Sequence, residues 1–176
     1  MRIRLAIAAL ALTLAVPVHA QGLMGDIHQD LNDVQKKFID LANAIPESAY
    51  SWKPNGARTV GEVILHVASD NYLMPVYLGA PAPASTGITS DYNTASAFEK
   101  RRLTKAQIIA DLTASFGHLH RNIGADDSKL NETIKMFGQD FTRRKAVVLI
   151  DNHLHEHLGQ LIAYARANNV TPPWSK

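Results

Sequence analysis

The chain has 176 residues, with 18 Lys and Arg, 16 Asp and Glu, 8 His and no cysteine. Without cysteine it can form no disulfide, hold no metal through thiolate and carry no lipid on an N-terminal cysteine. Arg2 and Arg4 precede an apolar run, and the rest of the chain has 16 residues of each charge. This neutral balance excludes the basic surface that a nucleic-acid-binding domain needs.

Residues 1–20 have the pattern of a secretory signal peptide. A short basic stretch is followed by an apolar run over residues 5–16 and by small residues at a cleavage site, Val18-His19-Ala20. The apolar run is shorter than the roughly 20 residues that a membrane-spanning helix needs. An uncleaved anchor helix is the alternative. We therefore expect residues 21–176 to form one exported domain, periplasmic or secreted, with no stable membrane anchor after cleavage.

Two amphipathic helices are predicted in the first half of this domain. The first begins at a capping-box pattern in residues 26–29 and ends before Pro46; its apolar positions are Ile27, Leu31, Val34, Phe38, Leu41 and Ile45. The second begins at a capping box in residues 59–62, and its stripe consists of Val60, Val63, Ile64, Val67 and Met74. Pro75 is expected to kink or end this second helix.

Two further helices are predicted in the second half. Residues 79–93 form a long segment rich in Gly, Pro and Ser, typical of a crossover or a lid. A third capping box in residues 104–107 begins a helix that Gly124 ends, with apolar positions at Ile108, Leu112, Phe116, Leu119 and Ile123. Residues 125–141 are compatible with a short helix or an irregular connection. Thr142 caps a last helix that extends to about Asn168.

No segment shows the period-two alternation of a strand over several residues, so the predicted fold is all-α, a four-helix bundle. A helix as long as the second spans about 28 Å, and fifteen linker residues can cover that distance. Helices two and three can therefore run parallel. We expect an up-down-down-up bundle with a long crossover between helices two and three.

The last predicted helix carries two histidines, His153 and His157, that are four residues apart. On a helix this spacing places both imidazoles on one face, where they can bind a single ion. Gln160 and Tyr164 extend the same ridge. His66 lies among apolar residues of the second helix and is the candidate third ligand. The alternative is that these three histidines are ordinary core residues hydrogen-bonded to neighbours.

The remaining histidines are expected at the surface, His155 because it points away from His153, and His118 and His120 because they flank the apolar stripe of their helix. The sequence His153-Leu-His-Glu156-His157 also matches an inverted zinc-protease pattern, in which the Glu is the general base. That class needs a further acidic ligand downstream, and no Asp or Glu follows Glu156. Glu156 is therefore a weak candidate for proton transfer.

These residues resemble the DinB/YfiT-like superfamily of metal-binding four-helix bundles. The resemblance covers nearly all of residues 23–174 and includes the Trp-containing loop SAYSWKPNGART, the helix TVGEVILHVASDN and the pattern His-x-x-x-His-x-Gly-Gln-Leu near the C-terminus. It implies an up-down-down-up bundle and a divalent metal held by His66, His153 and His157. It implies a supporting or structural role for Gln160. Characterised relatives include thiol-dependent transferases and isomerases.

The sequence predicts an exported metal-dependent enzyme, a transferase or a hydrolase, with a three-histidine site open to water or to a small-molecule substrate. Zinc and nickel are the first candidates, although imidazoles also suit copper and iron. A non-catalytic metal-binding or sensing module of the envelope is the alternative. A purely structural bundle is a third reading. No nucleic-acid partner is expected, and a homodimer is compatible with the sequence.

Overall fold

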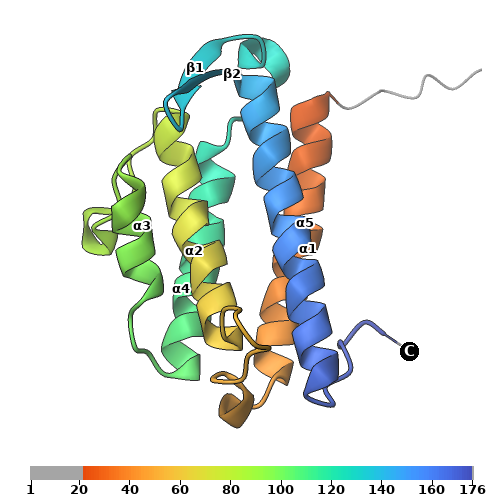
Figure 1. The fold of residues 1–176 in the computed structure, drawn as a ribbon. Helices are drawn as coiled ribbons and strands as arrows, with labels where there is room; N and C mark the ends of the chain where they lie inside the picture. Colours follow the sequence, from red (N-terminus) through yellow and green to blue (C-terminus); the bar gives the residue numbers. More distant parts are fainter. Residues whose placement is uncertain (1–21, 176) are drawn as a thin grey trace, which may run out of the picture.

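The computed structural model describes residues 22–175 (Figure 1). The predicted signal peptide, residues 1–20, lies outside the described residues. The helices are α1 (Leu23–Ala44), α2 (Val60–Tyr77), α3 (Tyr92–Glu99), α4 (Lys105–Asn122) and α5 (Arg143–Ala167), and the strands are β1 (Thr133–Met136) and β2 (Gln139–Thr142). Within the described residues, no helix combines the length and the apolar character needed to cross a membrane.

The four long helices form the predicted up-down-down-up bundle. In Figure 1, α1 and α5 run downwards, and α2 and α4 run upwards beside each other. The crossover between α2 and α4 is longer than predicted, and it includes the unpredicted helix α3, which packs against α2. This eight-residue helix buries only Ala95, Phe98 and Glu99, which is too short an apolar pattern to be recognised in the sequence.

Three of the four predicted N-caps are confirmed. The side chains of Thr59 and Thr104 form complete capping boxes, and Thr142 accepts a hydrogen bond from the Lys145 amide. The capping box predicted at residues 26–29 is wrong, because α1 already begins at Leu23. The carboxylate of Asp127 caps this helix from a distant part of the chain, 2.9 Å from the Leu23 nitrogen and 2.8 Å from the Met24 nitrogen.

We expect Asp127→Ala to lower the free energy of unfolding by about 1–2 kcal/mol, because two amide donors of α1 lose their acceptor. Urea denaturation measures the change. Asp126→Ala is the control, since the Asp126 side chain caps only its own short turn through the Ser128 amide. Equal effects of the two substitutions would contradict the assignment of Asp127 as the cap of α1.

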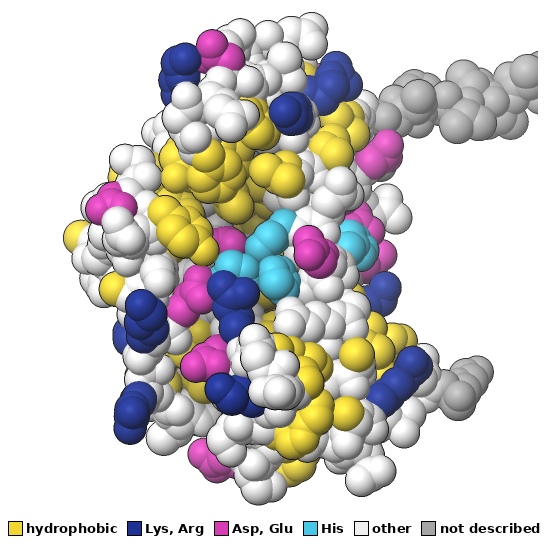
Figure 2. Space-filling model, viewed as in Figure 1, with side chains coloured by type: hydrophobic (Ala, Val, Ile, Leu, Met, Phe, Trp, Pro, Cys, Tyr) yellow, Lys and Arg dark blue, Asp and Glu magenta, His cyan; other side chains and the backbone are white. Residues whose placement is uncertain are grey.

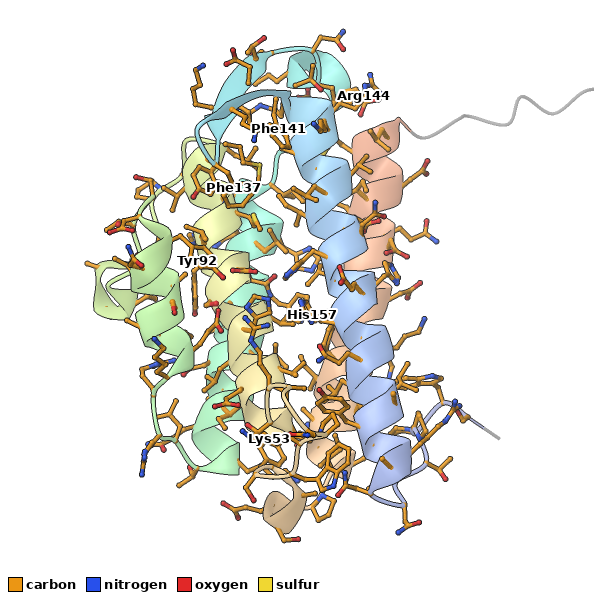
Figure 3. The ribbon with its side chains drawn as sticks, in the orientation of Figure 1. Lys53, Tyr92, Phe137, Phe141, Arg144 and His157 are labelled. Carbon is orange, nitrogen blue, oxygen red and sulfur yellow. The ribbon has the colours of Figure 1, made fainter. Side chains whose placement is uncertain are left out.

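The segment left undecided in the sequence, residues 125–141, contains a β-hairpin rather than a helix. Strands β1 and β2 pair antiparallel, with Met136 opposite Gln139. Phe137 and Gly138 form the two-residue turn with φ angles of 52° and 74°. Hairpin turns of type I′ require positive φ at both central residues and favour Asn-Gly, so a Phe-Gly turn is hard to recognise. The Phe137 ring, labelled in Figure 3, packs against Tyr77 with centroids 5.0 Å apart.

Helix α2 is the central element of the bundle. It contacts α3, α4 and α5, and every residue from 60 to 75 except Glu62 is buried. Because it is enclosed, its polar residues are buried together with its apolar stripe, namely His66, Ser69, Asp70 and Asn71. Buried polar groups are costly unless they have partners. The partners of His66 and Asp70 define the candidate site.

Candidate metal centre

Helices α2 and α5 bring the three predicted ligands together. The Nε2 atoms of His66 and His153 are 3.2 Å apart, and the ring of His157 lies 4.6 Å from that of His66 and 4.4 Å from that of His153, between centroids. His157 extends from α5 towards α2 (Figure 3). His66 is 6% exposed, and the His153 side chain is 19% exposed. The residues predicted from spacing therefore converge at one point.

Hydrogen bonds orient two of these imidazoles. The Nδ1 atom of His66 donates to Glu99 Oε1 at 2.7 Å, and the Nδ1 atom of His157 donates to Gln160 Oε1 at 2.8 Å. A neutral imidazole protonated at Nδ1 has its free lone pair on Nε2. Both rings are therefore held in the tautomer that presents Nε2 as a metal ligand, the arrangement found around histidine ligands in metalloproteins.

These hydrogen-bond acceptors are themselves held in place. Glu99 accepts from Ser69 Oγ at 3.3 Å and pairs with Arg58 at 3.3 Å. On the other side, Gln160 Nε2 donates to the Tyr164 hydroxyl at 2.9 Å, and Trp52 packs edge-on against the Tyr164 ring. The ridge of Gln160 and Tyr164 predicted from the sequence is confirmed, and it ties the Trp-containing loop to α5.

Electrostatics favour a neutral imidazole at His157 and an ionised carboxylate at Glu99. Burial lowers the pKa of His157, and the neighbouring His153 and His66 lower it further, although the Gln160 hydrogen bond opposes this. Burial acts to raise the pKa of Glu99, but the hydrogen bond and charge of His66 and the charge of Arg58 lower it overall. A neutral imidazole keeps its lone pair available for a metal.

Two buried carboxylates beside the histidines were not predicted. Asp70 Oδ2 lies 3.1 Å from His153 Nε2 and 3.5 Å from His66 Nε2. Asp70 could have been found, because His66 and Asp70 have the same four-residue spacing as the pair on α5. Glu99 gave no such signal, since it lies on the unpredicted α3. Glu156, the weak candidate for proton transfer, is exposed on α5.

The arrangement fits a divalent ion. Two ligands that are 2.0–2.1 Å from a tetrahedral ion are separated by about 3.3–3.4 Å, close to the 3.2 Å between the two Nε2 atoms. The donor set contains imidazole and carboxylate and no thiolate, which suits zinc, nickel and other first-row divalent metals. His66, His153 and His157 could therefore hold the ion.

The sequence model of the DinB superfamily matches residues 30–161, three quarters of the chain and all three histidines. The chain belongs to the DinB superfamily. Its fold is similar to that of a DinB-like protein from Bacillus cereus, with 18% identity, a TM-score of 0.65, and coverage of 86% of this chain and 97% of that one. A DinB-like protein from Bacillus subtilis is also similar, with 21% identity, a TM-score of 0.59, and coverage of 83% and 93%. No protein with a curated description is detectably similar in sequence.

The other histidines of this DinB domain only partly follow the predictions. His155 is exposed, as expected, and pairs with Asp30 of α1. The prediction that His118 lies at the surface is wrong: it is 6% exposed and packs against the Tyr72 ring, with centroids 5.4 Å apart. The half-buried His120 contacts Gln35 through Nε2. Because α4 packs tightly between α1 and α2, residues that flank its apolar stripe are covered as well.

Asp151 lies on the side of α5 opposite the three histidines, and the pKa of its carboxyl group is raised. Burial and the nearby charge of Asp30 raise its pKa from 3.8 to about 6. A folded-state pKa above the unfolded value means that Asp151 contributes stability below pH 3.8, and that this contribution is lost as the pH rises through about 6. The ionised side chain therefore destabilises the protein at neutral pH.

Asp151→Asn is expected to stabilise the protein at pH 8 by about 1 kcal/mol, after allowance for solvent screening of this partly exposed group. The gain should disappear near pH 4, where Asp151 itself is protonated. Urea denaturation at the two pH values measures it. Asp33→Asn, at an exposed position of α1, is the control for the change in net charge. A gain that does not depend on pH would contradict the electrostatic explanation.

Proposed function

We propose that this chain is an exported metal-dependent enzyme of DinB type, a transferase or a hydrolase. His66, His153 and His157 hold a divalent transition metal, with zinc and nickel as the first candidates, and leave a position for water or a small-molecule substrate. The observation that carries the proposal is the convergence of three imidazoles, two of them fixed with Nε2 towards the common point. A hydrophobic core gains nothing from such an arrangement.

The position of the histidines supports access by a substrate. Figure 2 shows histidine side chains at the centre of one face of the molecule, with acidic and basic side chains beside them and an apolar patch above. Arg58, whose side chain is 40% exposed, lies against Glu99 and places a positive charge close to the site. A polar small molecule could therefore approach the histidines from solvent.

A bound divalent ion would act as a Lewis acid that polarises a coordinated water, thiol or other substrate group and makes it a better nucleophile near neutral pH. The protein itself orients the ligands and shapes the access to the ion. His66 and His157 are held in one tautomer by Glu99 and Gln160, and the walls of α2 and α5 limit the directions of approach. Export is proposed from the signal-peptide pattern of residues 1–20.

Elemental analysis of the purified, untreated protein tests the metal. We expect about one equivalent of a divalent transition metal, and after chelation we expect added zinc or nickel to raise the melting temperature. A screen of small thiols and activated esters with the reloaded protein then tests for transferase or hydrolase activity. Protein that carries no metal, and whose melting temperature is unchanged by zinc and by nickel, would contradict the proposal.

A non-catalytic metal-binding or sensing module is the second candidate, favoured by the buried Asp70 carboxylate next to the histidines. Four protein ligands around an ion that accepts no further ligand would leave it unable to bind substrate. Azide added to the cobalt-loaded protein distinguishes the two functions. A change in the visible spectrum shows that a position is accessible to an exogenous ligand, and an unchanged spectrum favours the closed module.

A further inference from the structure

The geometry points to a fourth protein ligand: we propose that Asp70 coordinates the ion directly through Oδ2. This inference rests on the proposed metal site. The distances from Asp70 Oδ2 to the Nε2 atoms of His153 and His66 are 3.1 and 3.5 Å, and the two nitrogens are 3.2 Å apart. These three atoms form a nearly equilateral triangle whose sides match the separation of about 3.3–3.4 Å between ligands of a tetrahedral ion.

The surroundings of Asp70 leave it no other charge partner. Asp70 is 5% exposed, and its Oδ1 atom is buried and has no hydrogen-bond partner among residues 22–175. The nearby cation, Arg58, pairs with Glu99 instead. Within the described chain, the basic side chains within 4 Å of the Asp70 carboxylate are the imidazoles of His66 and His153. A buried carboxylate is costly unless it is paired or coordinates a metal.

Coordination by the histidines removes the one remaining donor, His153 Nε2, because His66 is already held with its proton on Nδ1. When the Nε2 atoms of His66 and His153 bind an ion, neither atom has a proton to donate to Asp70. The Asp70 carboxylate then faces the ion itself. A direct bond from Oδ2 satisfies this buried charge and reduces the positive charge of the site by one. A site of three imidazoles and one carboxylate accepts substrate as a fifth ligand, which zinc tolerates and nickel, iron and manganese readily allow.

Glu99 provides a matched control, because it is another buried carboxylate that contacts His66, but on the nitrogen that faces away from the ion. Its Oε1 atom lies 2.7 Å from His66 Nδ1, whereas Asp70 Oδ2 lies on the Nε2 side. Loss of a partner that only orients a ligand lowers metal affinity by roughly 10- to 100-fold. Loss of a ligand should lower it further and should also change the ligand field.

The experiment compares wild type, Asp70→Ala, Asp70→Asn and Glu99→Gln by chelator competition for zinc and by the visible spectrum of the cobalt(II) form. We expect Asp70→Ala to weaken zinc binding by more than about 100-fold and to shift the cobalt bands. We expect Glu99→Gln to weaken binding by about 10-fold with the bands unchanged. Asp70→Asn keeps a neutral oxygen donor, so its zinc affinity should lie between those of Asp70→Ala and Glu99→Gln. It replaces the alanine variant in the comparison if Asp70→Ala does not fold.

The metal-free proteins supply a second readout. Because Asp70 is a buried carboxylate with an unpartnered oxygen, Asp70→Asn should not lower the melting temperature of the apo protein, but it should reduce the rise produced by zinc. If the Asp70 variants bind zinc within 10-fold of wild type and keep its cobalt spectrum, Asp70 is not a ligand, and the three-histidine site stands without it. If wild type binds neither zinc nor cobalt, the proposed metal site fails, and this inference fails with it.

Discussion

His66→Ala is expected to weaken zinc or nickel binding by about 100- to 1000-fold. Structural sites bind zinc with a free energy of about 10–16 kcal/mol, so the loss of one of four ligands should cost roughly 2.5–4 kcal/mol of binding free energy. His66 is the only one of the three histidines contributed by α2, so without it the remaining pair lies on a single helix. Isothermal titration with zinc, or chelator competition where binding is too tight, measures the loss.

His155→Ala is the matched control for this prediction. It removes an imidazole of α5 that is exposed and pairs with Asp30 rather than with the histidine cluster. Its zinc affinity should stay within a few-fold of wild type. The three-histidine assignment would be wrong if His66→Ala and His155→Ala behaved alike, or if His66→Ala bound zinc as tightly as the unmodified protein.

The largest effect on stability is expected for Phe38→Ala, at about 3–5 kcal/mol. The Phe38 side chain of α1 is fully buried, and its ring lies 5.9 Å from that of Phe116 on α4, between centroids. Removing the ring leaves a cavity between two helices of a tightly packed core. For a domain of this size, the melting temperature should fall by roughly 10 °C, which differential scanning calorimetry can follow.

Phe137→Ala provides the control of the same residue type. Phe137 is 45% exposed at the tip of the hairpin, so its removal costs mainly the contact with Tyr77. We expect this variant to lower the free energy of unfolding by less than about 1 kcal/mol. A similar loss of stability in both variants would show that Phe38 is not the packing residue that its burial indicates.

The parts of the fold predicted from the sequence are those encoded locally. Thr59, Thr104 and Thr142 precede helices with regular apolar stripes, and each caps its helix as predicted. The meeting of His66 with His153 and His157 could also be predicted, since each lies on an apolar face of a helix that must face the core. Helical spacing alone brings such residues to the bundle interior.

The parts that could not be predicted depend on contacts between distant segments. Asp127 caps α1 across about a hundred residues, so no pattern near residue 23 indicates where that helix begins. Helix α3 has too few apolar residues for a periodic signal, and Glu99 reaches His66 only because α3 packs on α2. The turn at Phe137 adopts positive φ with a residue that rarely does so.

The separation of the three histidines along the chain has a consequence for folding. His66 and His153 are 87 positions apart, on the central and the final helix. In a chain without cysteine, an ion shared by these two residues would act as a cross-link that closes a long loop and restricts the unfolded ensemble. Chelation should then loosen α5 first, as faster amide hydrogen exchange along that helix, while the pairing of α2 with α4 stays protected.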